Sequence, residues 1–113
     1  MLPRENVAIR QLYLLDLAVT NTGSVAWPAF GKRAVSVSYH WLDRRGKCVL
    51  FDGLRTSFPH DVRPGERVDV RCVLRAPDTP GRMTLVWTLV QEQVAWFNDK
   101  NRKSQHASEI ELA

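Results

Sequence analysis

The sequence predicts an all-β domain, an antiparallel β-sandwich with seven to eight strands. Turn signals recur along the chain between residues 21 and 97, and the runs between them are rich in Val, Leu, Trp and Tyr. Short strands with such regular punctuation are typical of a sandwich. The turn signals are residues 21–24 (NTGS), 43–46 (DRRG), 52–53 (DG), 64–66 (PGE) and 76–81 (APDTPG).

The composition is that of one ordinary folded domain, which we expect to span residues 1–113. A chain of 113 residues, 44% hydrophobic and 25% charged, can bury a core without disulfides or metals. The net charge of +4 is modest and does not by itself predict a nucleic-acid partner. We see no apolar run near the ~20 residues of a membrane span, and no signal-peptide pattern, so we expect a cytoplasmic location.

Residues 7–20 open the predicted fold. Their apolar side chains alternate, which indicates a half-buried strand, either one bent strand or two short ones. Leu12 and Leu14 interrupt the polar face, so a bulge or a kink between sheets is expected there. A helix is the competing prediction, because Leu12, Leu15 and Val19 also fit a helical stripe.

Residues 34–42 form the clearest predicted strand. One face is apolar and should point to the core, whereas the other is polar and should be exposed. Gly46 then supplies a left-handed turn position before a return strand at residues 47–51. The apolar face consists of Val35, Val37, Tyr39 and Trp41, and the polar face of Ser36, Ser38 and His40.

The later elements follow the same rules. In residues 67–75, Val68, Val70, Cys72 and Leu74 should point inward, and the outward arginines form a solvated edge rather than a nucleic-acid site. Residues 83–91 are apolar on both faces, as expected of a central strand. We further expect a type II turn at residues 64–65, an extended segment near an edge at 58–59, a hairpin loop or lid at 98–105, and a last strand at 108–112.

Trp41 indicates which kind of sandwich this is. In an immunoglobulin-like strand order the third strand carries a buried tryptophan, and Trp41 occupies that place. The cysteine pair of antibody domains is absent, so we predict an immunoglobulin/fibronectin-like sandwich of the fibronectin kind. Tyr39 and Trp87 also share a phase with apolar neighbours and should lie in the core.

The two cysteines, Cys48 and Cys72, are expected to be reduced thiols. A disulfide is disfavoured in the cytosol, and Cys72 lies in an apolar phase, although the spacing does not exclude a bridge. No CxxC pair or matching histidine spacing accompanies them. We therefore expect no metal and no cofactor.

We recognise no catalytic set, and we expect that the chain is not an enzyme. A nucleophilic triad needs Ser, Cys or Thr near a histidine that a carboxylate orients. His40 lies on a strand face, His60 in a turn and His106 in a polar stretch, and no two have metal-ligand spacing. The sequence also lacks a glycine-rich phosphate loop.

Aromatic residues near strand ends are the best candidates for a ligand surface. Trp27, Trp96 and Phe97 could form a platform for a sugar or a hot spot for a partner protein, or could close the ends of the sandwich as plugs. A sugar would also need polar groups nearby, and the candidates are Asn21, Gln91 and Asn98.

The order of the motifs resembles known families. The string resembles an immunoglobulin-like β-sandwich accessory module of bacterial cell-surface polysaccharide glycosyltransferases and O-antigen exporters. A looser likeness is to the four-tryptophan domain of autophagy receptors, a protein-interaction sandwich. The chain departs from the first pattern at Met83, where that module usually carries Tyr. The motifs are residues 21–28 (NTGSVAWP), 37–43 (VSYHWLD), 52–56 (DGLRT), 64–66 (PGE), 76–81 (APDTPG) and 89–97 (LVQEQVAWF).

The resemblances imply a non-catalytic binding or accessory module linked to bacterial envelope polysaccharide. The alternative is a protein–protein interaction sandwich with no glycan role. The partner would be a glycan or a protein, and the chain would be a monomer or a weak homodimer. Arg55 and Glu92 lie in the two most distinctive motifs, beside apolar strands, and we expect them to form a structural ion pair.

Overall fold

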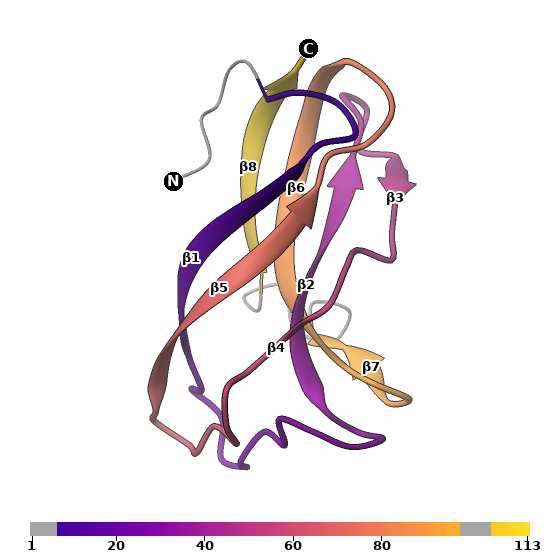
Figure 1. Cartoon of the computed structure of the whole chain (residues 1–113). Coiled ribbons are helices and arrows are strands. Elements are labelled where there is room, and N and C mark those ends of the chain that lie inside the picture. The colour runs from indigo at the N-terminus through magenta and orange to yellow at the C-terminus, as the bar shows by residue number, and fades with distance from the viewer. Residues whose placement is uncertain (1–6, 98–104) are drawn as a thin grey trace.

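The protein is an antiparallel β-sandwich in the computed structural model, which describes residues 7–97 and 105–113 (Figure 1). The predicted all-β sandwich is therefore confirmed. Its strands are β1 (Leu12–Thr20), β2 (Val35–Leu42), β3 (Cys48–Leu50), β4 (Thr56–Ser57), β5 (Arg67–Arg75), β6 (Gly81–Gln91), β7 (Ala95–Trp96) and β8 (Gln105–Leu112).

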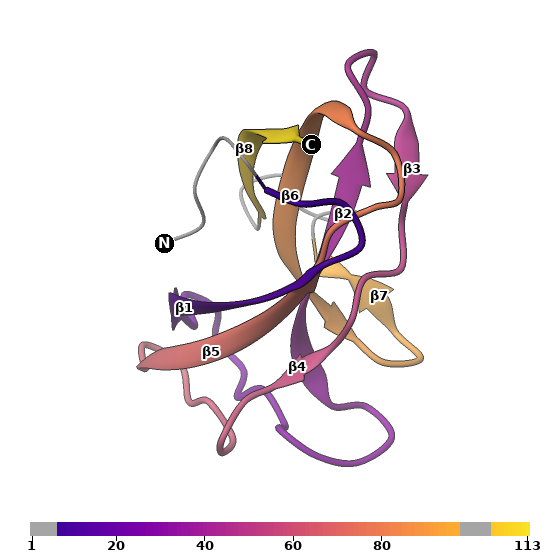
Figure 2. The same cartoon turned by 45° about the horizontal axis from the view of Figure 1, so that its top comes forward.

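Two sheets of unequal width make up the sandwich. The smaller sheet consists of β1 and β5. The larger sheet has β2 and β6 at its centre; β3 and β4 pair with β2, and β7 and β8 pair with β6. Figure 2 shows the β1–β5 pair crossing one face of the larger sheet.

The start of the fold differs from the prediction. β1 begins at Leu12, and its register with β5 runs from Leu12↔Arg75 to Thr20↔Arg67 without a break, so the bulge expected there is wrong. The bend lies earlier, at Arg10, whose φ is 65°. Before that bend Val7 forms a parallel bridge with Leu112, so the chain passes from the larger sheet to the smaller one. The alternation of β1 holds, and the helix alternative is excluded.

The core lies between the sheets and is anchored by aromatic residues of β2 and β6. Trp41 and Tyr39 are fully buried, and the Tyr39 ring meets the Trp87 ring edge-on at 5.4 Å. Trp41 Nε1 donates to the Arg75 carbonyl oxygen at 3.0 Å, and the Arg75 N–H donates to the Tyr39 hydroxyl oxygen at 2.9 Å. These aromatic side chains therefore fill the core, as predicted, and also join the two sheets by hydrogen bonds.

The polar face of β2 is buried, which corrects the expected exposure of Ser36, Ser38 and His40. The exposed fractions of these side chains are 5%, 0% and 5%. The segment that follows β3 covers them: Ser38 Oγ donates to the Leu54 carbonyl oxygen at 3.1 Å, and His40 Nδ1 contacts the Phe51 carbonyl oxygen. The alternation rule identified the two faces correctly, but it does not show when a loop covers the second one.

The remaining strands follow the sequence pattern closely. In β5 the side chains of Val68, Val70, Cys72 and Leu74 are buried, and in β6 both faces are largely buried. Gly46 and Gly65 have φ values of 80° and 82°, as their predicted turns require. β8 is longer than predicted, and the loop expected at 98–105 lies outside the described residues except for Gln105.

Candidate functional site

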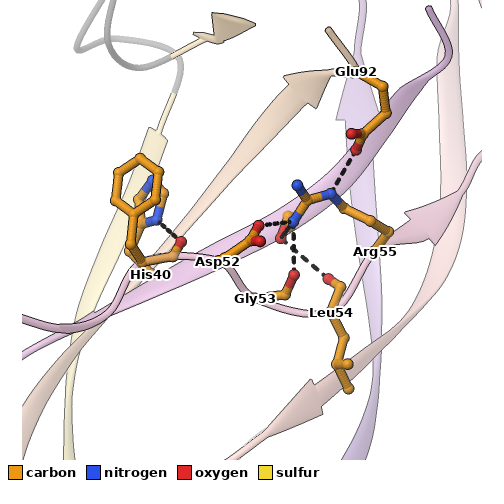
Figure 3. A network of polar contacts seen from close by, with 8 residues as sticks. His40, Asp52, Gly53, Leu54, Arg55 and Glu92 are labelled. Atoms are coloured by element: carbon orange, nitrogen blue, oxygen red, sulfur yellow. Dashed lines mark hydrogen bonds and ion pairs between the residues drawn. The ribbon is translucent and has the colours of Figure 1, made fainter. Parts of the chain in front are cut away.

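The two most distinctive motifs meet at Arg55, on the outer face of the larger sheet (Figure 3). Arg55 Nε donates to Glu92 Oε1 at 2.6 Å, so the expected ion pair is present. Arg55 Nη1 lies 2.6 Å from Asp52 Oδ1, and it donates to the Gly53 carbonyl oxygen at 2.8 Å and to Ser38 Oγ at 3.4 Å. Two carboxylates and a carbonyl thus fix one guanidinium group in place.

The surroundings of Arg55 keep it charged and oriented. Burial lowers the pKa of its guanidinium, but hydrogen bonds and charge attraction from Glu92 and Asp52 outweigh that effect, so the pKa is raised. The guanidinium carbon lies 4.8 Å from the centre of the Trp96 ring, which is cation–π geometry. Arg55 therefore acts as a rigid support for Trp96 rather than as a mobile surface charge.

Trp96 belongs to a cluster of three rings. His40 stacks on Phe51 with ring centroids 4.4 Å apart, and Trp96 lies 4.4 Å from His40 and 5.0 Å from Phe51. His40 Nε2 is buried without a hydrogen-bond partner. This part of the site was missed from the sequence, because the three rings come from β2, from the segment after β3 and from β7.

Several apolar side chains of the segments that build this cluster are open to solvent. Their exposed fractions range from 40% for Leu54 to 49% for Val94. Exposed apolar groups gathered around ordered polar ones are typical of interaction surfaces. We call this region the Arg55 surface; it consists of Val49, Phe51, Asp52, Leu54, Arg55, Glu92, Val94 and Trp96.

A groove lies on another side of the molecule, between β1 and the larger sheet. Its volume is about 540 Å³, and its wall includes Leu17 and Val19 of β1 and Trp87 and Leu89 of β6. Trp27 and Phe97 also line it, with their ring centroids 5.7 Å apart and nearly perpendicular. Trp27 also contacts Phe58 at 5.7 Å.

The predicted ligand residues are not brought together. Trp27 and Phe97 lie at the groove, whereas Trp96, although adjacent to Phe97 in sequence, packs against His40 on the outer face. Gln91 Nε2 donates to the Arg33 carbonyl oxygen at 3.1 Å, and Asn98 lies outside the described residues. Within the described residues, Trp27 and Phe97 thus lie together and Trp96 lies apart from them.

Asn21 is a structural residue, which corrects its expected ligand role. It is fully buried, and its Nδ2 donates to the carbonyl oxygens of Val25 and Val62, both at 3.0 Å. Its Oδ1 accepts from the Gly23 N–H at 3.0 Å. A buried amide with these partners fixes the turn after β1 and cannot reach a ligand.

In the described part of the chain, the contacts of His40 and His60 are structural. His60 Nε2 lies 3.6 Å from Glu66 Oε2, and His40 lies among the rings. Cys48 is exposed and Cys72 buried, and both are free thiols.

Within residues 7–97 and 105–113, no three His, Cys, Asp or Glu side chains are grouped so that they could hold a metal ion. In the same ranges, no helix is both long and apolar enough to cross a membrane.

Comparison with known families identifies the domain. The family model of the Ig-like domain from next to BRCA1 gene matches residues 5–101. The chain belongs to this family. Neither a curated protein nor a solved structure matches the chain. The match confirms the immunoglobulin-like fold class that both resemblances implied, but it gives no support to the accessory module of bacterial polysaccharide enzymes.

Membership in this family also explains the place of Trp41. The Val7 bridge to Leu112 lies before β1, and β2 is the next strand after β1. Trp41 lies in β2, where an immunoglobulin-like order places its buried tryptophan. Ig-like domains of this kind are generally non-catalytic and commonly mediate protein interactions.

Proposed function

We propose that this Ig-like domain is a non-catalytic module that binds another protein through the Arg55 surface. The observation that carries the proposal is the combination of Trp96, Phe51 and Arg55 in one ordered cluster with exposed apolar neighbours. Trp and Arg are the residue types that dominate binding energy at protein interfaces, above all where they are held in place before binding.

The charges of the surface indicate the chemistry of the partner. Asp52 and Glu92 share the single guanidinium of Arg55, and their side chains are 75% and 39% exposed. One negative charge therefore remains in excess within this group. A partner with an apolar segment flanked by Lys or Arg would cover the apolar side chains and meet that charge.

The glycan alternative has weaker support from the geometry. A sugar site would need stacked rings with polar groups beside them. Of the candidates, Asn21 is buried, and Trp27 and Trp96 lie in different ring clusters. The Arg55 surface instead offers exposed apolar side chains beside polar groups that are already paired with one another, which favours a protein partner.

Site-specific crosslinking tests the proposal. We would place a photoreactive amino acid at Leu54, or at the exposed Arg45 of the β2–β3 turn as the matched control, and irradiate the protein in cells. We expect a distinct crosslinked protein from position 54 that is absent from position 45, and Val94→Asp should remove it. Crosslinks that are identical at both positions, or insensitive to Val94→Asp, would contradict the proposal.

A glycan array tests the alternative with the same protein. Binding of an envelope saccharide that is lost in the Trp96→Ala variant would assign the Arg55 surface to a sugar and overturn the protein-binding proposal. We expect no saccharide to bind in a Trp96-dependent way.

A further inference from the structure

The free edge of β1 follows from its hydrogen-bond pattern with β5. The Ala76 N–H donates to the Gln11 carbonyl oxygen and the Asn21 N–H to the Glu66 carbonyl oxygen, and both contacts continue the β1–β5 register. In an antiparallel pair, alternate residues direct both backbone groups to the partner strand, and the residues between them direct both groups away. Odd-numbered residues of β1 therefore bond to β5. The residues whose N–H and C=O groups point to the open side are Leu12, Leu14, Asp16, Ala18 and Thr20.

This edge lacks the features that normally prevent strand addition. In the described part of the chain β1 pairs only with β5, over nine residues in unbroken register and without Pro or Gly. Natural edge strands are usually short, bulged, or marked by Lys or Pro. The one charged residue in β1 is Asp16, which already forms an ion pair with Arg71 of β5, with 3.0 Å between Asp16 Oδ1 and Arg71 Nε.

β1 carries apolar side chains on both of its faces. Its inward face carries Leu15, Leu17 and Val19, and its outward face carries Leu12 and Leu14, of which Leu14 is 67% exposed. A strand added to β1 would shield part of this exposed apolar surface, because side chains of neighbouring strands lie side by side on the same face of a sheet.

The groove lies directly beside this edge and opens into the space between the sheets. A strand added to β1 would direct every second side chain into it, against Leu17, Val19, Trp87 and Leu89. The opposite wall is formed in part by His106 of β8, so the groove runs between edges of the two sheets.

The chain itself already adds an extended segment to β8, at the end of that strand away from the groove, where Figure 1 shows the N-terminal ribbon beside β8. Val7 bridges Leu112 in parallel, the Ile9 N–H donates to the Ala113 carbonyl oxygen at 3.2 Å, and the Ala113 N–H donates to the Val7 carbonyl oxygen at 2.9 Å. An edge of the larger sheet therefore already accepts an extended backbone from another segment of the chain.

We propose that β1 is a second binding site, where an extended segment of a partner protein adds as a strand. The segment bonds to the outward backbone groups of β1 and places alternate aliphatic or β-branched side chains in the groove. Opposite Asp16 it carries a neutral or basic residue, because like charges directly opposite each other destabilise a strand pair. The site is separate from the Arg55 surface and does not depend on it.

A second copy of the chain fits this edge less well than a peptide does. Asp16 is the central residue of β1, so a two-fold antiparallel pairing over the whole strand would place two Asp16 carboxylates opposite each other. Each copy also carries a net charge of +4, which opposes self-association.

A synthetic peptide with the sequence of residues 67–75, with Val in place of Cys72, is the probe. This sequence already pairs with β1 on its other edge, with alternating apolar residues and Arg71 opposite Asp16. Amide hydrogen exchange of the full chain, followed by NMR, reads the binding. We expect added protection at residues 12, 14, 16, 18 and 20, and no change at the odd-numbered amides, which β5 already protects.

Two variants at one position provide the control. Ala18→Pro removes an outward N–H and places a proline ring on the edge without breaking a hydrogen bond to β5. It should lower the affinity for the peptide about tenfold. Ala18→Thr keeps the N–H and should bind as the unmodified protein does. Circular dichroism and thermal unfolding confirm that both variants are folded.

Three results would overturn the proposal. They are no added protection at about 1 mM peptide, equal binding by the Pro and Thr variants, and a β1-dependent dimer of the unmodified protein in sedimentation, which would assign the edge to a second copy. Ala18→Pro should leave crosslinking from position 54 unchanged, so failure of this site and failure of the Arg55 surface are distinguishable.

Discussion

Gly53 lies against Tyr39 so closely that no larger residue fits at its position. A Cβ on Gly53 would meet the Tyr39 carbonyl oxygen at 2.5 Å and two Tyr39 ring carbons at 2.8 Å, and the Gly53 N–H donates to that oxygen at 3.2 Å. This contact holds the segment after β3 against the edge of β2. Phe51 and Arg55 are thereby placed over the outer face of the sheet.

Gly53→Ala should therefore destabilise the fold by about 1–3 kcal/mol, because the added methyl group overlaps backbone that cannot move easily. Gly23→Ala is the matched control, since its Cβ would meet only Asn21 Oδ1, at 3.3 Å. Urea unfolding measures both variants. Equal stability of the two would show that the Gly53 contact can relax.

The sandwich could be predicted from the sequence because turn residues and period-two patterns are local. Gly46 and Gly65 marked turns at the correct places, and the alternation in β5 identified its buried side chains. The same local signals also located Trp41 in the core. These features depend only on residues that are close together in the sequence, so one sequence is enough to reveal them.

The candidate surfaces could be predicted only in part, because they depend on which segments cross which face. Arg55 and Glu92 could be paired from their distinctive motifs, but the burial of His40 under Phe51 and Trp96 depends on the path of a loop. The free edge of β1 was also hidden, since a strand pattern is the same whether one or two neighbours are present.

The Arg55–Glu92 pair should show a measurable but modest coupling energy. Both side chains are about one-third exposed, so solvent screens the attraction, and we expect a coupling near 1 kcal/mol. A double-mutant cycle with Arg55→Met and Glu92→Gln measures it by urea unfolding. Arg55→Met should also shift the Trp96 fluorescence, because it removes the cation beside the ring. A coupling of zero would show that Glu92 adds nothing to the contacts of Arg55 with Asp52 and Gly53.

The two cysteines should differ sharply in reactivity. Cys48 is exposed, whereas burial raises the pKa of the Cys72 thiol to about 11. In the native protein at pH 8, a thiol reagent should label Cys48 quickly and Cys72 only after unfolding, as peptide mass mapping would show. Equally fast labelling of both would contradict the burial of Cys72.

The raised pKa of Cys72 also predicts a dependence of stability on pH. The folded state retains the thiol proton more strongly than the unfolded chain, so the stabilisation is complete below the unfolded pKa of 9.0 and is lost as pH rises to about 11. We expect the loss to reach roughly 2–3 kcal/mol. Cys72→Val has no thiol and should lose less stability over the same range, which separates this effect from other groups that titrate there. Parallel pH profiles of the two proteins would contradict it.

Trp41 should be the most costly residue to truncate, because it fills the core and its Nε1 donates to the Arg75 carbonyl oxygen on the opposite sheet. Trp41→Ala should cost about 3–5 kcal/mol through lost burial and a cavity. Trp41→Phe keeps most of the packing and should cost less, with the unpaired Arg75 carbonyl oxygen contributing about 1–3 kcal/mol.

Trp96→Ala is the matched control, since Trp96 is only half-buried on the outer face and its truncation should cost less than Trp41→Ala. Urea unfolding of the three variants tests this order, and a loss below about 1 kcal/mol for Trp41→Ala would show that the residue does not anchor the core.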